Sequence, residues 1–222
     1  MASKKLNKAL GDIVYYNNPP NFTDMNRITK VLSKLDLLFS SIIFLKDHFV
    51  ILLALGLIAA FGRVIQLGGL GEISTLTNVI LEVVVETSRV IIFLYVLGVA
   101  NIKKGFYQVR QLFSGKSKLR GIRAIAFQKL KSNWVNISLS FLGFLIIAGT
   151  INFLIDQLAY QTCLYLSLKR EGILVDTSSE WTILLFFKNI LVIPFTLVFE
   201  TIFLLWITDK ITVKYIHLHE IQ

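Results

Sequence analysis

Three ionisable side chains interrupt an otherwise apolar stretch of the chain at residues 76–102. They are Glu82, Glu86 and Arg89. A charged side chain inside hydrocarbon costs several kcal/mol, so a membrane-spanning helix keeps charges only where they are paired or used. Their i, i+4, i+7 spacing places all three on one face of a helix. We therefore expect this face to avoid lipid and to pack against another helix or subunit.

The composition places the chain among integral membrane proteins. Hydrophobic residues make up 55% of its 222 residues and charged residues only 17%, whereas soluble domains carry about 25% charged residues. Because Cys163 is the single cysteine, no internal disulfide can form.

Four segments exceed or approach the about 20 residues needed to cross roughly 30 Å of hydrocarbon. We predict an all-α integral membrane protein, a four-transmembrane-helix bundle with spans at residues 49–67, 76–101, 135–155 and 181–207. Arg63 is near enough to the end of the first span for its side chain to reach the interface. Gly56 and Ala60 favour close approach of another helix. Pro194 removes a backbone hydrogen bond from the fourth span and predicts a kink or hinge.

Lysine and arginine placement predicts the orientation, because loops rich in these residues stay in the cytoplasm. The loop at residues 102–134 holds nine of the 23 basic residues and no acidic residue. We call it the basic hairpin, and its basic residues are Lys103, Lys104, Arg110, Lys116, Lys118, Arg120, Arg123, Lys129 and Lys131. The loop at 156–180 is then outside, and the arm at 1–48 and the tail at 209–222 are both cytoplasmic. The pattern suits a bacterial inner membrane or another cellular membrane.

The N-terminal arm contains an amphipathic pattern that ends near Ile42. Its apolar residues recur at helical spacing and lie opposite Arg27, Lys30 and Lys34. Such a helix before a span is typical of an interfacial helix on the cytoplasmic leaflet, which either orients the span or contacts a partner. A competing register makes residues 37–61 the first span. It would bury the charged segment 46–48 at mid-membrane, so we favour a start at residue 49.

Three interpretations of the basic hairpin stay open. It is a topology signal alone, it attracts anionic lipid headgroups, or it docks an acidic cytoplasmic protein. Nucleic-acid binding is not favoured, because few aromatic residues lie among the basic ones. The segment is too long for a bare turn, so we expect helices to continue into it from both spans.

Depth along the helices predicts partners for the charged face. Counting about 1.5 Å per residue from the outer ends, Glu82 and Lys188 both lie roughly 10 Å deep and are predicted to pair. Arg89 lies within reach of the depth of Glu200, and Glu86 can pair with Arg89 at i, i+3. These residues either form a packing network, within one chain or between subunits, or line an ion path.

Sequence motifs for catalysis are missing, since HExxH, GxSxG and a complete phosphate-binding loop are absent. His217 and His219 alone are a weak metal signal. We predict no enzyme, no cofactor and no metal site. The leading hypothesis is a non-catalytic membrane subunit that forms a homo-oligomer or joins a larger complex. The alternative is an oligomeric ion or proton channel or transporter lined by the glutamates of the second span.

Overall fold

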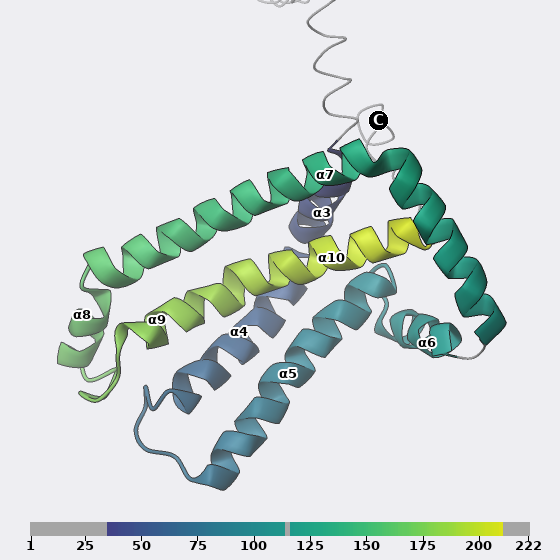
Figure 1. Ribbon diagram of the computed structural model, residues 1–222. Helices are drawn as coiled ribbons and strands as arrows, with labels where there is room; N and C mark the ends of the chain where they lie inside the picture. The colour runs from purple at the N-terminus through teal and green to yellow at the C-terminus, as the bar shows by residue number, and fades with distance from the viewer. Residues whose placement is uncertain (1–34, 114–115, 211–222) are drawn as a thin grey trace, which may run out of the picture. The chain divides into compact units, whose positions relative to one another are not determined.

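The computed structural model describes residues 35–113 and 116–210, with only the backbone described at 112, 113 and 116–120. These ranges are helical and contain no strand, which confirms the all-α prediction. Figure 1 shows the helices α3 (Asp36–Asp47), α4 (Phe49–Gln66), α5 (Thr75–Leu97), α6 (Ile102–Phe113), α7 (Lys116–Gln161), α8 (Leu164–Arg170), α9 (Glu180–Phe187), the π-helix η1 (Lys188–Val192) and α10 (Ile193–Ile207). The predicted interfacial residues Arg27, Lys30 and Lys34 lie outside the described ranges.

Three helical stretches in the described ranges are long and apolar enough to cross a membrane. They are α4, residues 121–161 of α7, and the continuous stretch Glu180–Ile207 formed by α9, η1 and α10. The number rises to four if α5 and α6, which are bent by 85° to one another, count together. The start of α4 and the end of α10 coincide with the ends of the predicted first and fourth spans, whereas α5 ends at Leu97 and α7 extends well beyond residues 135–155 on both sides. The helices are compatible with a multi-pass membrane protein.

A tight corner separates α5 from α6 and starts the basic hairpin. Val99 and Ala100 have positive φ angles of 52° and 65°, so the chain leaves the helical direction after Gly98. A Cβ atom at Gly98 would collide with the Asn101 carbonyl oxygen, and one at Gly105 with that of Leu94. These glycines let α6 fold back against α5. The hairpin is helical, but only α7 continues into it from a span, because this corner separates α6 from α5.

The long helix α7 changes direction at Asn133, whose φ and ψ of −121° and 21° are not helical. The break separates the basic residues 116–132 from the apolar stretch that follows. Trp134 lies directly after the break with 65% of its surface exposed, and Trp181 at the start of α9 is 56% exposed. Tryptophan is enriched at both membrane–water interfaces. The two exposed tryptophans at the starts of these apolar stretches are compatible with membrane-spanning segments.

The core is built around α10, which packs against α3, α5 and α7. Leu52, Val96 and Val198 bring α4, α5 and α10 together in one buried cluster. Phe144 of α7 stacks on Phe199 of α10, with ring centroids 4.4 Å apart and planes 9° from parallel. Aromatic pairs in this range add about 0.5–1.5 kcal/mol beyond their area burial. This stack fixes the third apolar stretch against the fourth.

Helix α3 contains the described end of the predicted amphipathic helix and packs between α7 and α10. Leu37 and Leu38 are each only 5% exposed, and Ser41 is fully buried. The helical path breaks at His48, with φ −114° and ψ 22°, before α4 begins. Residues 37–61 are therefore not one continuous helix, which agrees with the favoured start at residue 49.

Close packing between α4 and the fourth apolar stretch occurs at Gly56. An ideal Cβ there would lie 3.1 Å from the carbonyl oxygen of Asn189 and 3.4 Å from Cγ of Pro194. Pro194 cannot donate a backbone hydrogen bond, and the irregularity that it predicts takes the form of η1 just before it. The close approach that Gly56 and Ala60 predict is confirmed, since both are buried.

We predict that Gly56→Leu lowers the free energy of unfolding by about 1–3 kcal/mol, the usual effect of overpacking a tight contact. Thermal or denaturant unfolding in one detergent measures the change. Gly149→Leu is the matched control, because a Cβ at Gly149 meets no atom within 4 Å. Equal losses for the two variants would contradict the close packing at Gly56.

Candidate functional site

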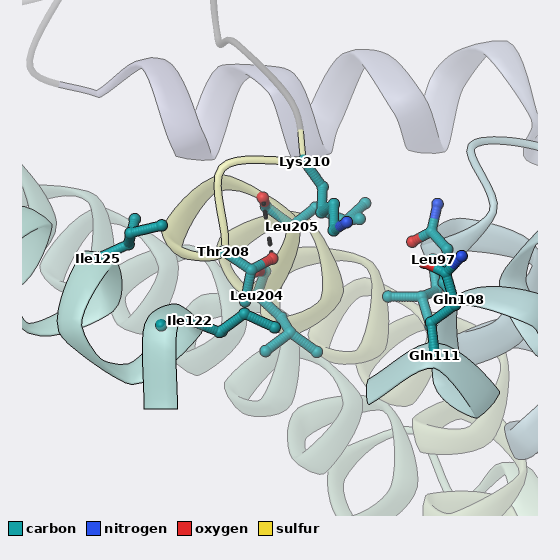
Figure 2. A pocket seen from close by; sticks show the side chains of 10 residues that line it. Leu97, Gln108, Gln111, Ile122, Ile125, Leu204, Leu205, Thr208 and Lys210 are labelled. Carbon is teal, nitrogen blue, oxygen red and sulfur yellow. Dashed lines mark hydrogen bonds between the residues drawn. The ribbon is translucent and has the colours of Figure 1, made fainter. Parts of the chain in front are cut away.

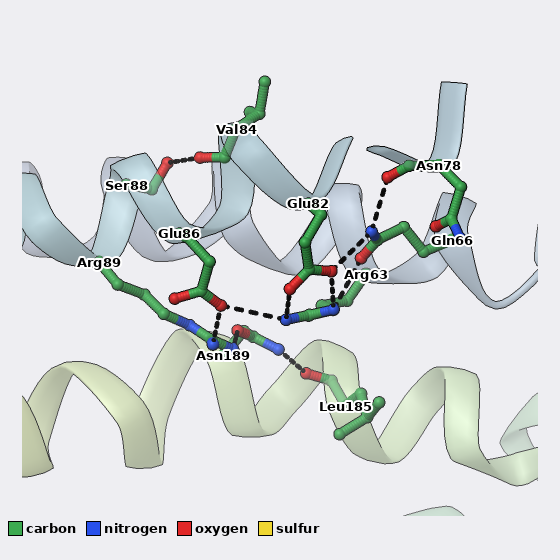
Figure 3. Close-up of polar contacts among 10 residues, drawn as sticks. All are labelled: Arg63, Gln66, Asn78, Glu82, Val84, Glu86, Ser88, Arg89, Leu185 and Asn189. Atoms are coloured by element: carbon green, nitrogen blue, oxygen red, sulfur yellow. Dashed lines mark hydrogen bonds and ion pairs between the residues drawn. The ribbon is translucent and has the colours of Figure 1, made fainter. Parts of the chain in front are cut away.

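Four charged side chains of α4 and α5 form a connected group, which we call the charge cluster. It consists of Arg63, Glu82, Glu86 and Arg89 (Figure 3). Arg63 donates to both carboxylate oxygens of Glu82, at 2.7 and 3.1 Å. It also donates to Glu86 at 3.2 Å, and Arg89 donates to the same Glu86 oxygen at 2.6 Å. The two cations and two carboxylates balance, so the cluster has no net charge.

Local packing explains why Arg63 meets the glutamates. Val85 lies between Glu82 and Glu86 in the sequence. Its side chain is fully buried on the side of α5 that faces α4. A Cβ atom at Gly62 would lie 2.6 Å from Cγ2 of Val85, so only glycine leaves room for this approach. The residue after Gly62 is Arg63, which therefore lies beside the acidic face of α5.

Uncharged polar groups extend the cluster at both ends. Towards the turn between α4 and α5, Gln66 donates to Glu82 at 3.0 Å and to the Asn78 carbonyl at 3.1 Å. At the other end, Arg89 donates to Oδ1 of Asn189 in η1 at 2.9 Å. Asn189 is 1% exposed and in turn donates to the Leu185 carbonyl at 2.7 Å. A hydrogen-bonded series of polar groups thus runs from the turn to the π-helix.

The charge cluster is paired internally but open on one side. The side chains of Glu82 and Glu86 are each 48% exposed, whereas those of Arg63 and Arg89 are 23% and 24% exposed. The arginines are thus shielded more than the carboxylates. The arrangement can hold α4, α5 and η1 together, and it can also present carboxylate oxygens to a partner or to water.

The predicted pair between Glu82 and Lys188 is wrong. Glu82 bonds Arg63, whereas Nζ of Lys188 lies 3.9 Å from Oδ1 of Asp156 on α7. Equal depth is not sufficient for pairing, because the rotation of each helix decides which side chains meet. The rotation of α4 likewise decides the partner of Arg63. Its side chain forms an ion pair with Glu82 of the same protein instead of extending alone to the membrane interface. The i, i+3 pair of Glu86 with Arg89 is confirmed.

Glu200 is separate from the charge cluster. Arg89, its predicted neighbour, bonds Glu86 and Asn189 instead. The Glu200 side chain is exposed on α10, and no basic side chain in the described ranges pairs with it. It lies seven residues before the end of α10, which corresponds to about 10 Å along the helix. An exposed carboxylate therefore lies well inside an otherwise apolar helix.

The basic hairpin presents part of its charge to solvent. Exposed side chains include Lys103, Lys104, Arg110, Arg123 and Lys131. The side chains of Lys116, Lys118 and Arg120 lie outside the description. Lys129 is instead bound to the end of α10, where it donates to Asp209 at 2.6 Å and to the Trp206 carbonyl at 2.9 Å. The nitrogen also lies 5.2 Å from the centre of the Trp206 ring.

Sequence reasoning missed Gln66 and Asn189, which extend the charge cluster, and Asp156, which is the partner of Lys188. It also did not identify Arg63 as the central partner. Their polar side chains in or next to apolar segments were the available signal. Among the residues that the structure describes, no group of three His, Cys, Asp or Glu side chains could hold a metal ion.

The chain matches no protein-family model, and searches of curated proteins and of solved structures found no similar protein.

We expect Arg63→Gln to lower the melting temperature in detergent more than Lys188→Gln. Removing Arg63 leaves Glu82 without its ion pair and removes one of two cations from Glu86, whereas Lys188 loses one contact at 3.9 Å. Adding Glu82→Gln to Arg63→Gln should recover part of the loss. A double variant that is less stable than Arg63→Gln alone would contradict this account of the cluster.

Proposed function

We propose that the protein is a non-catalytic, four-span membrane subunit that self-associates or joins a larger membrane complex. Its spans are α4, α5, the apolar part of α7, and the stretch from α9 to α10. The positive-inside pattern supports a cytoplasmic basic hairpin and cytoplasmic termini. We place α6, which is bent by 85° from α5, close to the membrane plane on that side.

The observation that carries the proposal is the exposed Glu200. A carboxylate facing lipid at this depth is unfavourable, and charged residues in spans almost always face a bundle interior, a cavity or a partner. In the described ranges, no basic group of the same chain satisfies Glu200. A neighbouring subunit that covers this face of α10 would remove the cost. The half-exposed carboxylates of Glu82 and Glu86 support the same conclusion.

Wild-type protein in lipid nanodiscs is expected to contain more than one chain per assembly, or one chain with a stoichiometric partner. Subunit counting by photobleaching and mass photometry measure this. Glu200→Gln should weaken the assembly by about tenfold or more, because it removes one member of a desolvated charged contact. Glu72→Gln is the control, since Glu72 is exposed in the turn before α5. A wild-type protein that is monodisperse, monomeric and without partner would contradict the proposal.

A second candidate function is an oligomeric ion or proton channel or transporter. It is favoured by the hydrogen-bonded series from Asn78 through the charge cluster to Asn189, because polar chains inside membranes commonly serve ion or proton paths. The π-helix next to Asn189 fits as well, since π-bulges frequently occur at functional sites. Four helices enclose little space, so a path would be shared between subunits.

Under this second candidate, purified protein in liposomes should conduct an ion or protons under a gradient. Glu86→Gln should reduce the flux severalfold, because Glu86 connects Arg63 with Arg89 in the series. Fluorescent pH and ion indicators inside the liposomes measure the rate, and Glu72→Gln again controls for loss of a carboxylate. Wild-type protein without flux under several ion gradients and voltages would reject the channel while leaving the subunit proposal intact.

A further inference from the structure

A cavity of about 340 Å³ lies where the ends of α5 and α10 meet α6 and the basic part of α7 (Figure 2). Its apolar wall includes Leu97, Ile122 and Leu204, and its polar lining includes Gln108, Gln111 and Lys210. Ligand sites in proteins commonly occupy about 300–1,000 Å³ and combine apolar walls with a few polar groups. The cavity therefore has the size and lining of a site for an amphiphilic molecule.

One polar atom of the lining is unsatisfied. Oε1 of Gln108 is buried and has no hydrogen-bond partner in the described part of the protein. Buried polar atoms are rarely left without a partner, and a bound molecule with a donor group would provide one. Gln108 and Lys210 both line this cavity (Figure 2). The acceptor requires an O–H or N–H group, and the lysine favours an anion.

The cavity lies at the level expected for lipid headgroups. Leu97 and Leu204 belong to the ends of two apolar helices, and α6 leaves α5 at 85°. On α6, Phe106 is 62% exposed, and Lys103 and Lys104 are exposed beside it. An amphipathic helix with exposed aromatic and basic residues is typical of the boundary between headgroups and acyl chains. The cavity is thus reached from the leaflet that contains the basic hairpin.

The charge around the cavity favours an anionic occupant. The sequence contains no acidic residue between Glu86 and Asp156, which includes all of α6 and the basic part of α7. Asp209 follows α10 directly, but its carboxylate is bound by Lys129 at 2.6 Å. Cytoplasmic leaflets carry anionic lipids that attract such basic segments.

We infer that this cavity binds one anionic phospholipid of the cytoplasmic leaflet whose headgroup carries a hydroxyl group, as phosphatidylglycerol does. Lys210 neutralises the phosphate, and a headgroup hydroxyl donates to Oε1 of Gln108. The glycerol and the first acyl carbons lie against Leu97 and Leu204. This inference rests on the orientation stated in the proposed function, but it does not require self-association.

Native mass spectrometry of the delipidated full chain, titrated with phosphatidylglycerol or phosphatidylcholine, tests the inference. We expect one phosphatidylglycerol molecule to bind at least about tenfold more tightly than phosphatidylcholine, a difference of about 1.4 kcal/mol. Lys210→Gln should remove most of this preference, whereas Lys103→Gln, an equal loss of charge outside the cavity lining, should leave it. Soluble glycerol phosphate should not compete, because it lacks the acyl chains.

A second variant tests whether lipid binding requires the volume of the cavity, instead of the charge of Lys210. A Cβ atom at Gly121 meets no atom of the described residues within 4 Å, so Gly121→Leu adds a side chain to the cavity lining without a clash among them. We expect it to reduce phosphatidylglycerol binding while the melting temperature stays unchanged. Equal binding of both lipids, or equal losses in Lys210→Gln and Lys103→Gln, would overturn the site. Competition by glycerol phosphate would assign it to a soluble phosphate instead. A monomeric protein that keeps the lipid preference would overturn only the proposed assembly.

Discussion

The ion pairs between Arg63 and the glutamates of α5 are the interaction on which the rest of the structure depends. Without them, α5 would place two carboxylates in an apolar environment, where each costs several kcal/mol. With them, α5 can lie beside α4 as part of one neutral unit. Gly62 makes this possible, because the missing side chain lets Val85 pack close enough to bring Arg63 to Glu82. The two carboxylates of α5 are therefore tolerated through the packing of α5 on α4.

The charged side chains differ in how far the rest of the protein covers them. Arg63 and Arg89 are mostly covered and each bond a carboxylate, whereas Glu82 and Glu86 remain half exposed. Glu200 on α10 is exposed and has no basic partner in the described ranges. The three side chains of this set that remain partly or largely exposed, Glu82, Glu86 and Glu200, are all acidic. Charge complementarity to Glu200 therefore supports the proposed assembly, in which a neighbouring subunit presents a basic or hydrogen-bond donor group to α10.

The sequence predicted where the helices lie better than it predicted which side chains meet. Hydropathy placed the start of α4 at residue 49 and the end of α10 at residue 207, because apolar length is a property of the chain itself. The partner of Glu82 was not predictable from depth, which fixes only the position along a helix. Rotation about the helix axis depends on tertiary contacts such as Gly62 against Val85. Glu86 and Arg89 were predicted correctly since both lie on one helix, where the backbone fixes the geometry.

The π-helix η1 is the turn at which contacts from α4, α5 and α7 meet the stretch from α9 to α10. Lys188 and Asn189 are consecutive residues of η1 and have different partners. Lys188 lies near Asp156 of α7, whereas Asn189 accepts a hydrogen bond from Arg89 of α5. Gly56 allows α4 to pack closely against the same turn, since a Cβ atom added at Gly56 would lie 3.1 Å from the carbonyl oxygen of Asn189. Pro194 follows and cannot restore regular hydrogen bonding to this turn. Contacts from α4, α5 and α7 therefore converge on η1, so this one turn joins the charge cluster to the packing of the other helices.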